Sequence, residues 1–164
     1  MIRWGNGKSG AGGASLKAEA HRVMASVRDL SWEGYHSLIA DIFRRRGHDV
    51  FAGEGPDQDV IDMEMAAGDR KVIVNCQLRG MRHISVAPLE EMALVAERNG
   101  AASVLLITDG DFSPEARSYA SDHSLVLVDG EALLELVMEL TFGDEREQRI
   151  GARLAKLFKR GGAN

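Results

Sequence analysis

Two carboxylates and two amides alternate along neighbouring stretches of this sequence, and these four residues are the ones best suited to chemistry. Asp62 and Glu64 are separated by one residue, and so are Asn75 and Gln77. Alternating residues of a strand share one face, and carboxylate and amide oxygens are ligands that Mg²⁺ accepts. The pattern is typical of metal-dependent phosphodiester hydrolysis, but one essential positive charge is missing beside it.

A predicted β-hairpin positions these four side chains. Polar and apolar residues alternate over 60–65 and again over 71–77, which indicates two strands, and Gly68-Asp69 supplies a two-residue turn. This register sets Asp62 across from Asn75 on the outward face. Glu64 and Gln77 share that face, across from Ile73 and Val60. The other face is apolar and suited to burial, with Ile61 across from Cys76, Met63 from Val74 and Met65 from Val72.

Helices and strands alternate through the rest of the sequence and predict an α/β fold. Ser31 caps a helix with an apolar stripe, and a short strand at 49–52 precedes the hairpin. A helix follows Ser85, an apolar strand covers 103–108, Ser113-Pro114 opens another helix, and a strand at 125–128 leads to a helix at 131–140. We therefore expect an α/β fold with a mixed central sheet, an α-β-β-β-α-β core flanked by helices.

The chain divides into four predicted segments. Residues 1–14 are Gly-rich and predict a flexible arm, and residues 15–30 predict an additional N-terminal helix that begins at Ser15. The α/β domain covers 31–141. Residues 142–164 predict a C-terminal amphipathic helix and tail.

Composition narrows the class of protein. The 164 residues are 45% apolar with a net charge of -5, which suits one globular domain and excludes coating of nucleic acid by bulk positive charge. Any contact with DNA must then use a focused patch. The single Cys76 excludes an internal disulfide, and the five His lack partners at zinc-ligand spacing. We expect a cytoplasmic protein without a membrane span.

At several landmarks the sequence resembles the Mrr-like restriction endonucleases of type IV restriction, within the PD-(D/E)xK superfamily. The landmarks are the helix start Ser31–His36, the hairpin, the run Ile107–Ala116 and the segment Val128–Leu134, in the order and spacing of that family. The resemblance implies a restriction-endonuclease-like fold. It also implies recognition of DNA, often modified DNA, and cutting of its backbone in defence against foreign genomes.

The catalytic motif of that family is only partly present. Its first helix carries a Glu after an aromatic residue, its second strand an Asp and its third strand a Gln-x-Lys. Asp62 matches the metal-binding Asp, whereas His36 replaces the Glu, Asn75 the Gln and Gln77 the Lys. Loss of one preorganised donor costs about 3–4 kcal/mol in catalysis. The resemblance thus predicts a DNA-binding family member whose cleavage is impaired or lost.

Metal binding and two other functions stay open at this stage. Asp62 and Glu64 predict at most weak Mg²⁺ binding, because imidazole is a poor substitute for a carboxylate ligand of Mg²⁺. An active Mg²⁺- or Mn²⁺-dependent DNA endonuclease would need a relocated cation, for which Arg79 and Lys71 point to the correct face if the strand continues. A protein-interaction module on a nuclease fold is the third hypothesis, and a homodimer is left open.

Several charged and reactive residues have two interpretations. Arg79, Arg82 and His83 directly follow the site strand and are candidate contacts to the DNA backbone, or else ordinary loop charges. The loop Asp109-Gly110-Asp111 is interpreted as an acidic turn and not as a ligand site. Cys76 lies on the apolar face of the hairpin and is interpreted as a core residue, not as a nucleophile.

Overall fold

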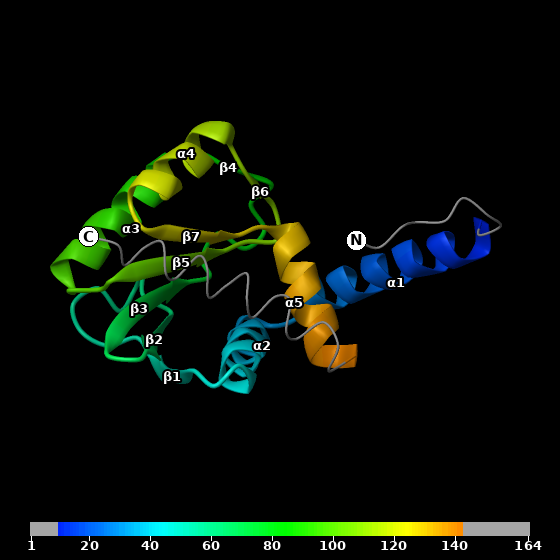
Figure 1. Cartoon of the computed structure of the whole chain (residues 1–164), viewed down its shortest axis with the longest axis horizontal. Coiled ribbons are helices and arrows are strands. Elements are labelled where there is room, and N and C mark those ends of the chain that lie inside the picture. Colours follow the sequence, from blue (N-terminus) through cyan, green and yellow to red (C-terminus); the bar gives the residue numbers. More distant parts are fainter. Residues whose placement is uncertain (1–9, 143–164) are drawn as a thin grey trace.

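Five strands form the central sheet of the structure, a computed structural model that describes residues 10–142 (Figure 1). Their order across the sheet is β1-β2-β3-β5-β7. Strands β1, β2 and β3 pair antiparallel, and β3, β5 and β7 pair parallel. The mixed sheet predicted from the sequence is confirmed, with the bounds Asp49–Ala52, Met63–Ala67, Arg70–Asn75, Ser103–Ile107 and Leu125–Val128 for the five strands.

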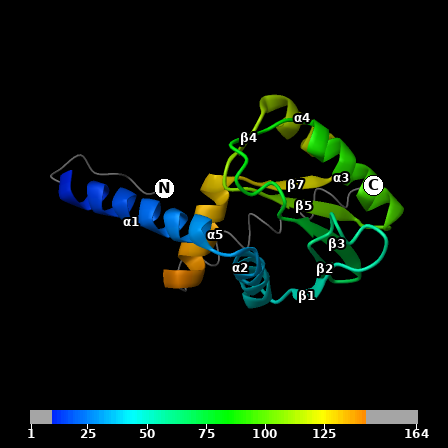
Figure 2. The same ribbon diagram turned by 180° about the vertical axis from the view of Figure 1, so that it is seen from behind.

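Helices cover both faces of the sheet. Helix α2 (Trp32–Arg45) and helix α5 (Gly130–Phe142) lie on one face, and α3 (Ala87–Arg98) and α4 (Pro114–Asp122) lie on the other (Figures 1 and 2). Helix α1 (Gly10–Asp29) contacts α5, and both views show its N-terminal part projecting away from the sheet. The result is a three-layer α/β/α arrangement.

Two apolar cores lie on opposite faces of the sheet. The first joins α1, α2 and α5 to the sheet through residues such as Met63, Val74 and Cys76. The second joins α3 and α4 to the sheet through residues such as Ile73 and Leu106. Neighbouring residues of one strand enter different cores, which is the alternation expected of a sheet covered on both faces.

The predicted hairpin register is confirmed within the strands. Met63 lies across from Val74 and Met65 from Val72, and Gly68 adopts a positive φ of 67° at the first position of the two-residue turn. Strand β2 begins only at Met63, however, three residues later than predicted. The backbone N–H groups of Val60 and Ile61 both donate to the Asp57 carbonyl, so a turn precedes the strand.

This late start makes one predicted pairing wrong. Ile61 was expected beside Met63 on the face of Cys76, but its side chain belongs to the other core, with Ile73. Alternation holds only within a continuous strand, and the turn at Asp57 reverses the face to which Ile61 points. The same turn determines the position of the neighbouring Asp62.

Helix starts follow the predicted capping residues in two cases. The Ser31 hydroxyl accepts a hydrogen bond from the Gly34 N–H at 3.0 Å, and the Ser113 hydroxyl accepts one from the Ala116 N–H at 3.1 Å. Helix α1 begins at Gly10, earlier than the Ser15 start expected from its capping propensity. Most of the predicted arm over 1–14 lies outside the described residues. The predicted C-terminal helix and tail over 142–164 lie almost wholly outside them.

A second, smaller sheet in the described residues was not predicted from the sequence. Short strands β4 (His83–Ile84) and β6 (Asp111–Phe112) pair in parallel as a separate two-stranded sheet.

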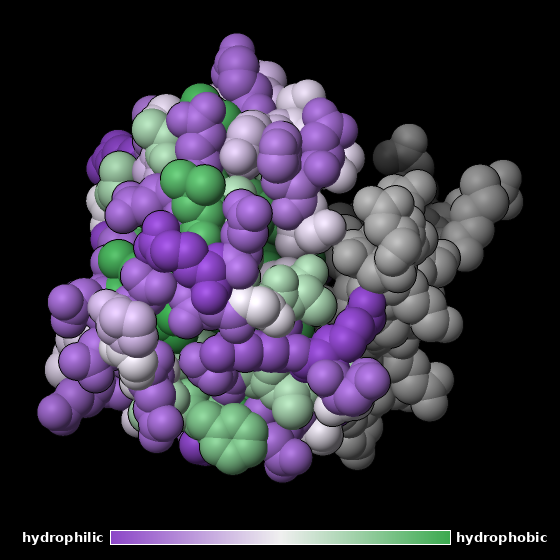
Figure 3. All heavy atoms as spheres, turned by 90° about the vertical axis from the view of Figure 1, so that its left-hand side faces the viewer, coloured by the Kyte–Doolittle hydropathy of each residue, from purple (hydrophilic) through white to green (hydrophobic). Residues whose placement is uncertain are grey.

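No helix between residues 10 and 142 has the length and apolar character needed to cross a membrane. The face drawn in Figure 3 is mostly hydrophilic, with hydrophobic side chains only in small separate areas.

Candidate active site

The Asp62 carboxylate lies in a nearly closed space between α2 and the end of β3. Only 6% of its side chain is exposed. Its Oδ2 accepts a hydrogen bond of 2.6 Å from the Cys76 backbone N–H, and its Oδ1 lies 3.3 Å from His36 Nε2. The carboxylate thus faces the side of the sheet that α2 covers. The expectation that it lies on an open outward surface is wrong, because the turn before β2 redirects it.

Helix α2 brings His36 to this carboxylate, at the position where the sequence resemblance placed a departure from Glu. The His36 ring lies against the Trp32 ring with centroids 4.9 Å apart, and 28% of the His36 side chain is exposed. Its buried Nε2 has no hydrogen-bond partner among the described residues, because the approach to Asp62 is close but poorly aligned. His36 and Asp62 are therefore brought together as expected.

Gln77 and Asn75 take different sides. Strand β3 ends at Asn75, so Gln77 lies in the turn that follows. Its side-chain amide donates to the Asp59 carbonyl, and a hydrogen bond from the same side chain lowers the pKa of Asp62. The Asn75 amide instead donates to the Val60 carbonyl at 2.8 Å and approaches the Met92 sulfur of α3. The expected meeting of Asn75 with Asp62 is therefore wrong. Asn75 follows the face of Ile73 within the strand, and Asp62 precedes its strand.

Glu64 is also kept away from the carboxylate that it was expected to assist. Its Oε1 forms an ion pair of 2.9 Å with Lys71 Nζ across the hairpin. Among the described residues, the cluster of metal-ligating side chains around Asp62 contains His36 and Cys76 but not Glu64. The ion pair also engages Lys71, one of the two cations considered as a replacement for the missing lysine.

Burial determines the electrostatics of the pair Asp62 and Cys76. Desolvation raises the pKa of Asp62 above its ordinary value, and the hydrogen bond from the Cys76 N–H and the nearby His36 partly offset this effect. Desolvation also raises the pKa of the Cys76 thiol, with a further contribution from the negative charge of Asp62. Cys76 is fully buried in the first core, which agrees with its interpretation as a core residue.

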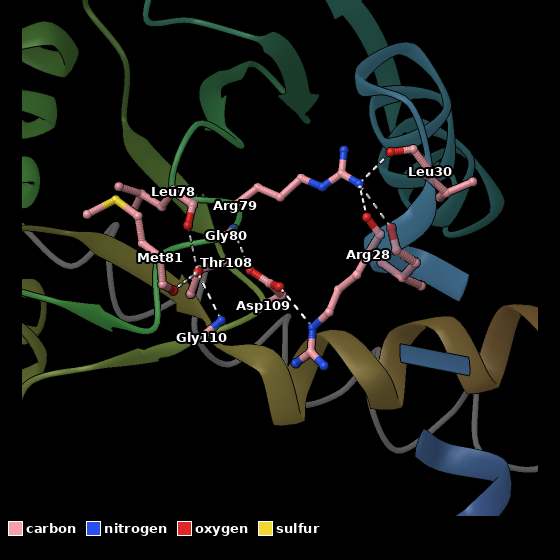
Figure 4. A network of polar contacts seen from close by, with 10 residues as sticks. Arg28, Leu30, Leu78, Arg79, Gly80, Met81, Thr108, Asp109 and Gly110 are labelled. Atoms are coloured by element: carbon pink, nitrogen blue, oxygen red, sulfur yellow. Dashed lines mark hydrogen bonds and ion pairs between the residues drawn. The ribbon is translucent and has the colours of Figure 1, made fainter. Parts of the chain in front are cut away.

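Arg79, the second candidate cation, binds the end of α1 (Figure 4). Its guanidinium donates to the carbonyl oxygens of Val27, Arg28, Leu30 and Ser31 at 2.5–3.4 Å, and lies 4.5 Å from the centre of the Tyr35 ring. These acceptors are the orphan carbonyls of a helix C-terminus and the link that follows it. Sequence reasoning missed this role, since no local signal connects Arg79 to a helix some fifty residues upstream.

A cleft of about 670 Å³ lies beside this contact, between the end of α1 and the loops at 79–82 and 109–111. The Asp109 carboxylate links two parts of the cleft lining. Its Oδ1 accepts a hydrogen bond from the Gly80 N–H at 2.7 Å, and its Oδ2 accepts one from Arg28 Nε at 3.0 Å (Figure 4). Gly110 packs so tightly against the neighbouring loop that an added Cβ would lie 2.0 Å from the Met81 carbonyl oxygen. These contacts agree with the interpretation of the loop as an acidic turn.

Arg82 and His83 are both exposed. Arg82 lines the cleft, and its guanidinium makes no hydrogen bond or ion pair within residues 10–142. His83 begins β4 and lies near Asp111, whose pKa is lowered mainly by the hydrogen bond from Arg117. Of the three predicted DNA contacts, these two have exposed side chains, whereas the Arg79 guanidinium is bound to the end of α1.

The residues around Asp62 do not fit the Mg²⁺ expected from the sequence. Mg²⁺ requires near-octahedral coordination by oxygen and retains several waters. The described donors within 4.8 Å of one another are instead a nitrogen of His36, an oxygen of Asp62 and the sulfur of Cys76. A single, nearly closed carboxylate with a thiol beside it is a poor ligand set for this ion.

Residues 27–137 of the chain match the model of a known protein family. This segment, more than half of the chain, matches the model of the Mrr catalytic domain, described as a restriction endonuclease. No curated protein is similar enough to the chain to count as a match.

Several solved structures are similar to the chain at low sequence identity. A protein of unknown function, AF1548, is 13% identical with a TM-score of 0.52, over 79% of this chain and 88% of that one. The DNA modification-dependent restriction endonuclease AspBHI is 11% identical with a TM-score of 0.52, over 87% of this chain. The MspJI restriction endonuclease, in complex with a 27-mer oligonucleotide, is 18% identical with a TM-score of 0.46, over 99% of this chain.

The chain spans 40% of the length of AspBHI and 41% of that of MspJI. AF1548 and AspBHI share the fold of this chain, a mixed sheet between helices. The fold class predicted from the sequence is confirmed.

Proposed function

The chain belongs to the Mrr-like restriction endonuclease family, and from this premise we propose that it binds DNA while its phosphodiester cleavage is impaired or lost. The family relation supports binding to DNA. The loss of cleavage rests on the environment of Asp62, the one residue of the chain that matches the acidic metal ligand of the family motif.

The enclosure of Asp62 is the observation that carries the proposal. A catalytic carboxylate must reach a metal ion and the scissile phosphate together. The Asp62 side chain is 6% exposed, and its Oδ2 is held by the Cys76 backbone N–H. We therefore infer that the Asp62 carboxylate is shielded from metal ions and DNA and also lacks partner ligands. The sequence had instead suggested a centre that is open but binds metal weakly.

The absence of a neighbouring cation supports the same conclusion. Residues 10–142 contain two lysines, Lys17 and Lys71; Lys17 is exposed on α1 and Lys71 is paired with Glu64. Within that described range, His36 is the ion-pair partner of Asp62. A scissile phosphate placed there would meet the neutral amide of Gln77 where the family motif has Lys, and it would lack a charged donor for its developing negative charge.

Binding to DNA is supported by the exposed Arg82 and His83. Contacts to phosphates position a protein on the duplex without reading its sequence. Arg82 has its guanidinium free within the described range and lines the open cleft, so it can reach a phosphate without breaking an internal contact. The acidic net charge of -5 requires that this contact be local.

A mobility-shift titration of the full chain with duplex DNA at several salt concentrations tests the proposal. We expect affinity to fall with salt, and Arg82→Ala to reduce the slope of log K against log salt by about 0.9, as for one lost phosphate contact. Arg22→Ala, which removes an exposed charge from α1, is the matched control and should leave the slope unchanged. Binding that does not change with salt would contradict the proposal and favour a protein-interaction module.

A cleavage assay with Mg²⁺ or Mn²⁺ on methylated and unmethylated plasmid completes the test. Wild-type protein should nick neither plasmid faster than Asp62→Ala does. Nicking that requires Asp62 would refute the loss of cleavage and leave the DNA-binding part of the proposal in place.

A further inference from the structure

His36, Asp62 and Cys76 form a compact cluster of three different metal-ligating groups. They come from α2, from the residue before β2 and from the residue after β3, and their donor atoms all lie within 4.8 Å of one another. The sequence showed no zinc signature because the three residues are far apart along the chain. The fold brings them together at the point where α2 packs on the sheet.

We propose that this cluster is a Zn²⁺ site with His36 Nε2, Asp62 Oδ1 and Cys76 Sγ as its protein ligands. Zinc is a borderline-soft ion that accepts imidazole, carboxylate and thiolate together, whereas Mg²⁺ accepts oxygen. The donor set that excludes Mg²⁺ at this position is therefore a set that suits Zn²⁺. This inference is independent of whether the chain binds DNA.

The distances fit a tetrahedral ion after a small contraction. Zinc binds nitrogen and oxygen at about 2.0–2.2 Å and thiolate sulfur at about 2.3 Å, so its tetrahedral ligands are about 3.3–3.8 Å apart. His36 Nε2 and Asp62 Oδ1 are already 3.3 Å apart. The other separations in the cluster are at most 4.8 Å, so the donor atoms must approach one another by up to about 1 Å to bind one ion.

The hydrogen bonds around the cluster leave the proposed ligand atoms available. The Cys76 backbone N–H holds Asp62 Oδ2 at 2.6 Å and leaves Oδ1 directed toward His36. His36 Nε2 is buried and has no hydrogen-bond partner in the described part of the chain. A buried polar nitrogen without a partner carries a desolvation cost that a metal bond removes.

The charges and protons balance on binding. A zinc–sulfur bond forms, the Cys76 thiol loses its proton to solvent, and Asp62 contributes the second negative charge. The dipositive ion is then neutralised by one thiolate and one carboxylate. Three protein ligands leave the fourth position of a tetrahedral zinc ion for a water molecule.

Metal content and a cobalt spectrum of the full chain test this site. After incubation with ZnCl₂ under thiol-reducing conditions and removal of free metal, we expect one zinc per chain. Co²⁺ should occupy the same site and show a thiolate-to-cobalt charge-transfer band, which identifies Cys76 because it is the only cysteine of the sequence. A tenfold excess of Mg²⁺ should not displace either ion.

Variants separate the cluster from adventitious binding to surface histidines. His36→Ala and Cys76→Ser should each weaken Zn²⁺ binding by more than the roughly 10- to 100-fold that loss of an outer-shell partner costs. His123→Ala is the matched control, because His123 is exposed and stacks on Tyr119 away from the cluster, and it should bind zinc like the wild type. Circular dichroism shows whether each variant is folded.

The outcomes decide the inference in either direction. A chain that retains no zinc, or a cobalt complex without the charge-transfer band, overturns it. So does a folded His36→Ala variant with wild-type affinity. If Cys76→Ser does not fold, the cobalt spectrum of the wild type and the affinity of His36→Ala still decide. DNA binding is not a readout of this experiment, so its failure and that of the proposed function are distinguishable.

Discussion

Arg79 shows how a residue chosen for one kind of chemistry can serve another. It was a candidate for the missing catalytic cation and for a DNA contact, and the structure places its guanidinium against carbonyl oxygens at the end of α1 and against the Tyr35 ring. A planar guanidinium can reach several acceptors at once, which the ammonium of a lysine cannot do with the same geometry. Arg79 thus joins the loop after the site strand to α1.

We predict that Arg79→Ala lowers the free energy of unfolding by about 2–3 kcal/mol, because several charge-assisted hydrogen bonds are lost. Arg79→Lys should recover part of this loss. Arg82→Ala, at the neighbouring exposed cation, should change stability by no more than about 0.5 kcal/mol. Denaturant unfolding measures all three, and equal losses for Arg79→Ala and Arg82→Ala would contradict the assignment.

Gly110 gives a second prediction at this scale. An added Cβ would meet the Met81 and Arg82 carbonyl oxygens at 2.0 and 2.7 Å, and backbone atoms cannot yield as a flexible side chain does. Gly110→Ala should therefore destabilise the fold by about 1–3 kcal/mol through overpacking. Gly13→Ala, where nothing lies within 4 Å of the added atom, should leave stability unchanged or raise it slightly. Thermal unfolding that ranks the two variants alike would refute this packing argument.

At the scale of elements, the hairpin shows what sequence pattern can and cannot predict. Its register follows from the turn at Gly68-Asp69 and from strict alternation, and both are local signals. The faces of the sheet toward which Asp62 and Asn75 point could not be predicted, because alternation does not show that β2 begins only at Met63. That start depends on the loop before it, where Gly53 packs against the Ile61 carbonyl oxygen so closely that an added Cβ would lie 2.0 Å away.

The docking of α2 on α5 depends on a buried ion pair that no sequence pattern predicted. Arg46 pairs with Glu139, and their side chains are 10% and 2% exposed. We predict that Glu139→Ala costs about 3–5 kcal/mol, because it leaves the Arg46 charge buried without its partner. Arg44→Ala removes an exposed pair with Asp41 and should cost less than about 1 kcal/mol. Chemical denaturation checks both, and a small effect of Glu139→Ala would show that the pair is not needed for docking.

The loop before β2 is tied to α3 by Asp57, which gives a pH-dependent prediction. Hydrogen bonds from Arg98 and Asn99 lower the pKa of Asp57 from its ordinary value of 3.8. A carboxyl group whose pKa is lowered by folding stabilises the fold above its unfolded pKa, and this contribution disappears as the pH falls through the folded pKa. Asp57→Asn should therefore melt below the wild type at neutral pH, and the difference should begin to shrink near pH 3.8 and vanish only below the lowered pKa of the folded state.

Thermal melts at several pH values follow this effect. Asp59→Asn is the control in the same loop, since the Asp59 side chain makes no ion pair within the described range. A constant difference between Asp57→Asn and the wild type across the acid range would exclude the ionised carboxylate as its source.

At the scale of the molecule, the chain combines a family fold with a site whose ligands, we propose, have changed. The helices and strands follow from periodicity and capping residues, and the mixed sheet follows from the family resemblance, whereas the order of the strands across the sheet comes from the structure alone. AF1548 and AspBHI share this fold. The site differs because its chemistry depends on residues that meet only in three dimensions. His36 and Cys76 lie far apart in the sequence without zinc-ligand spacing, and beside Asp62 they form the ligand set that we propose for Zn²⁺ in place of the expected Mg²⁺.

The central claim is that Asp62 no longer supports cleavage of DNA in a member of a nuclease family. The most direct test is the rate at which excess protein converts supercoiled plasmid to nicked or linear forms in Mg²⁺ or Mn²⁺, measured for the wild type beside Asp62→Ala. We predict equal background rates for the two proteins on methylated and unmethylated DNA. A faster rate for the wild type that Asp62→Ala abolishes would contradict the claim.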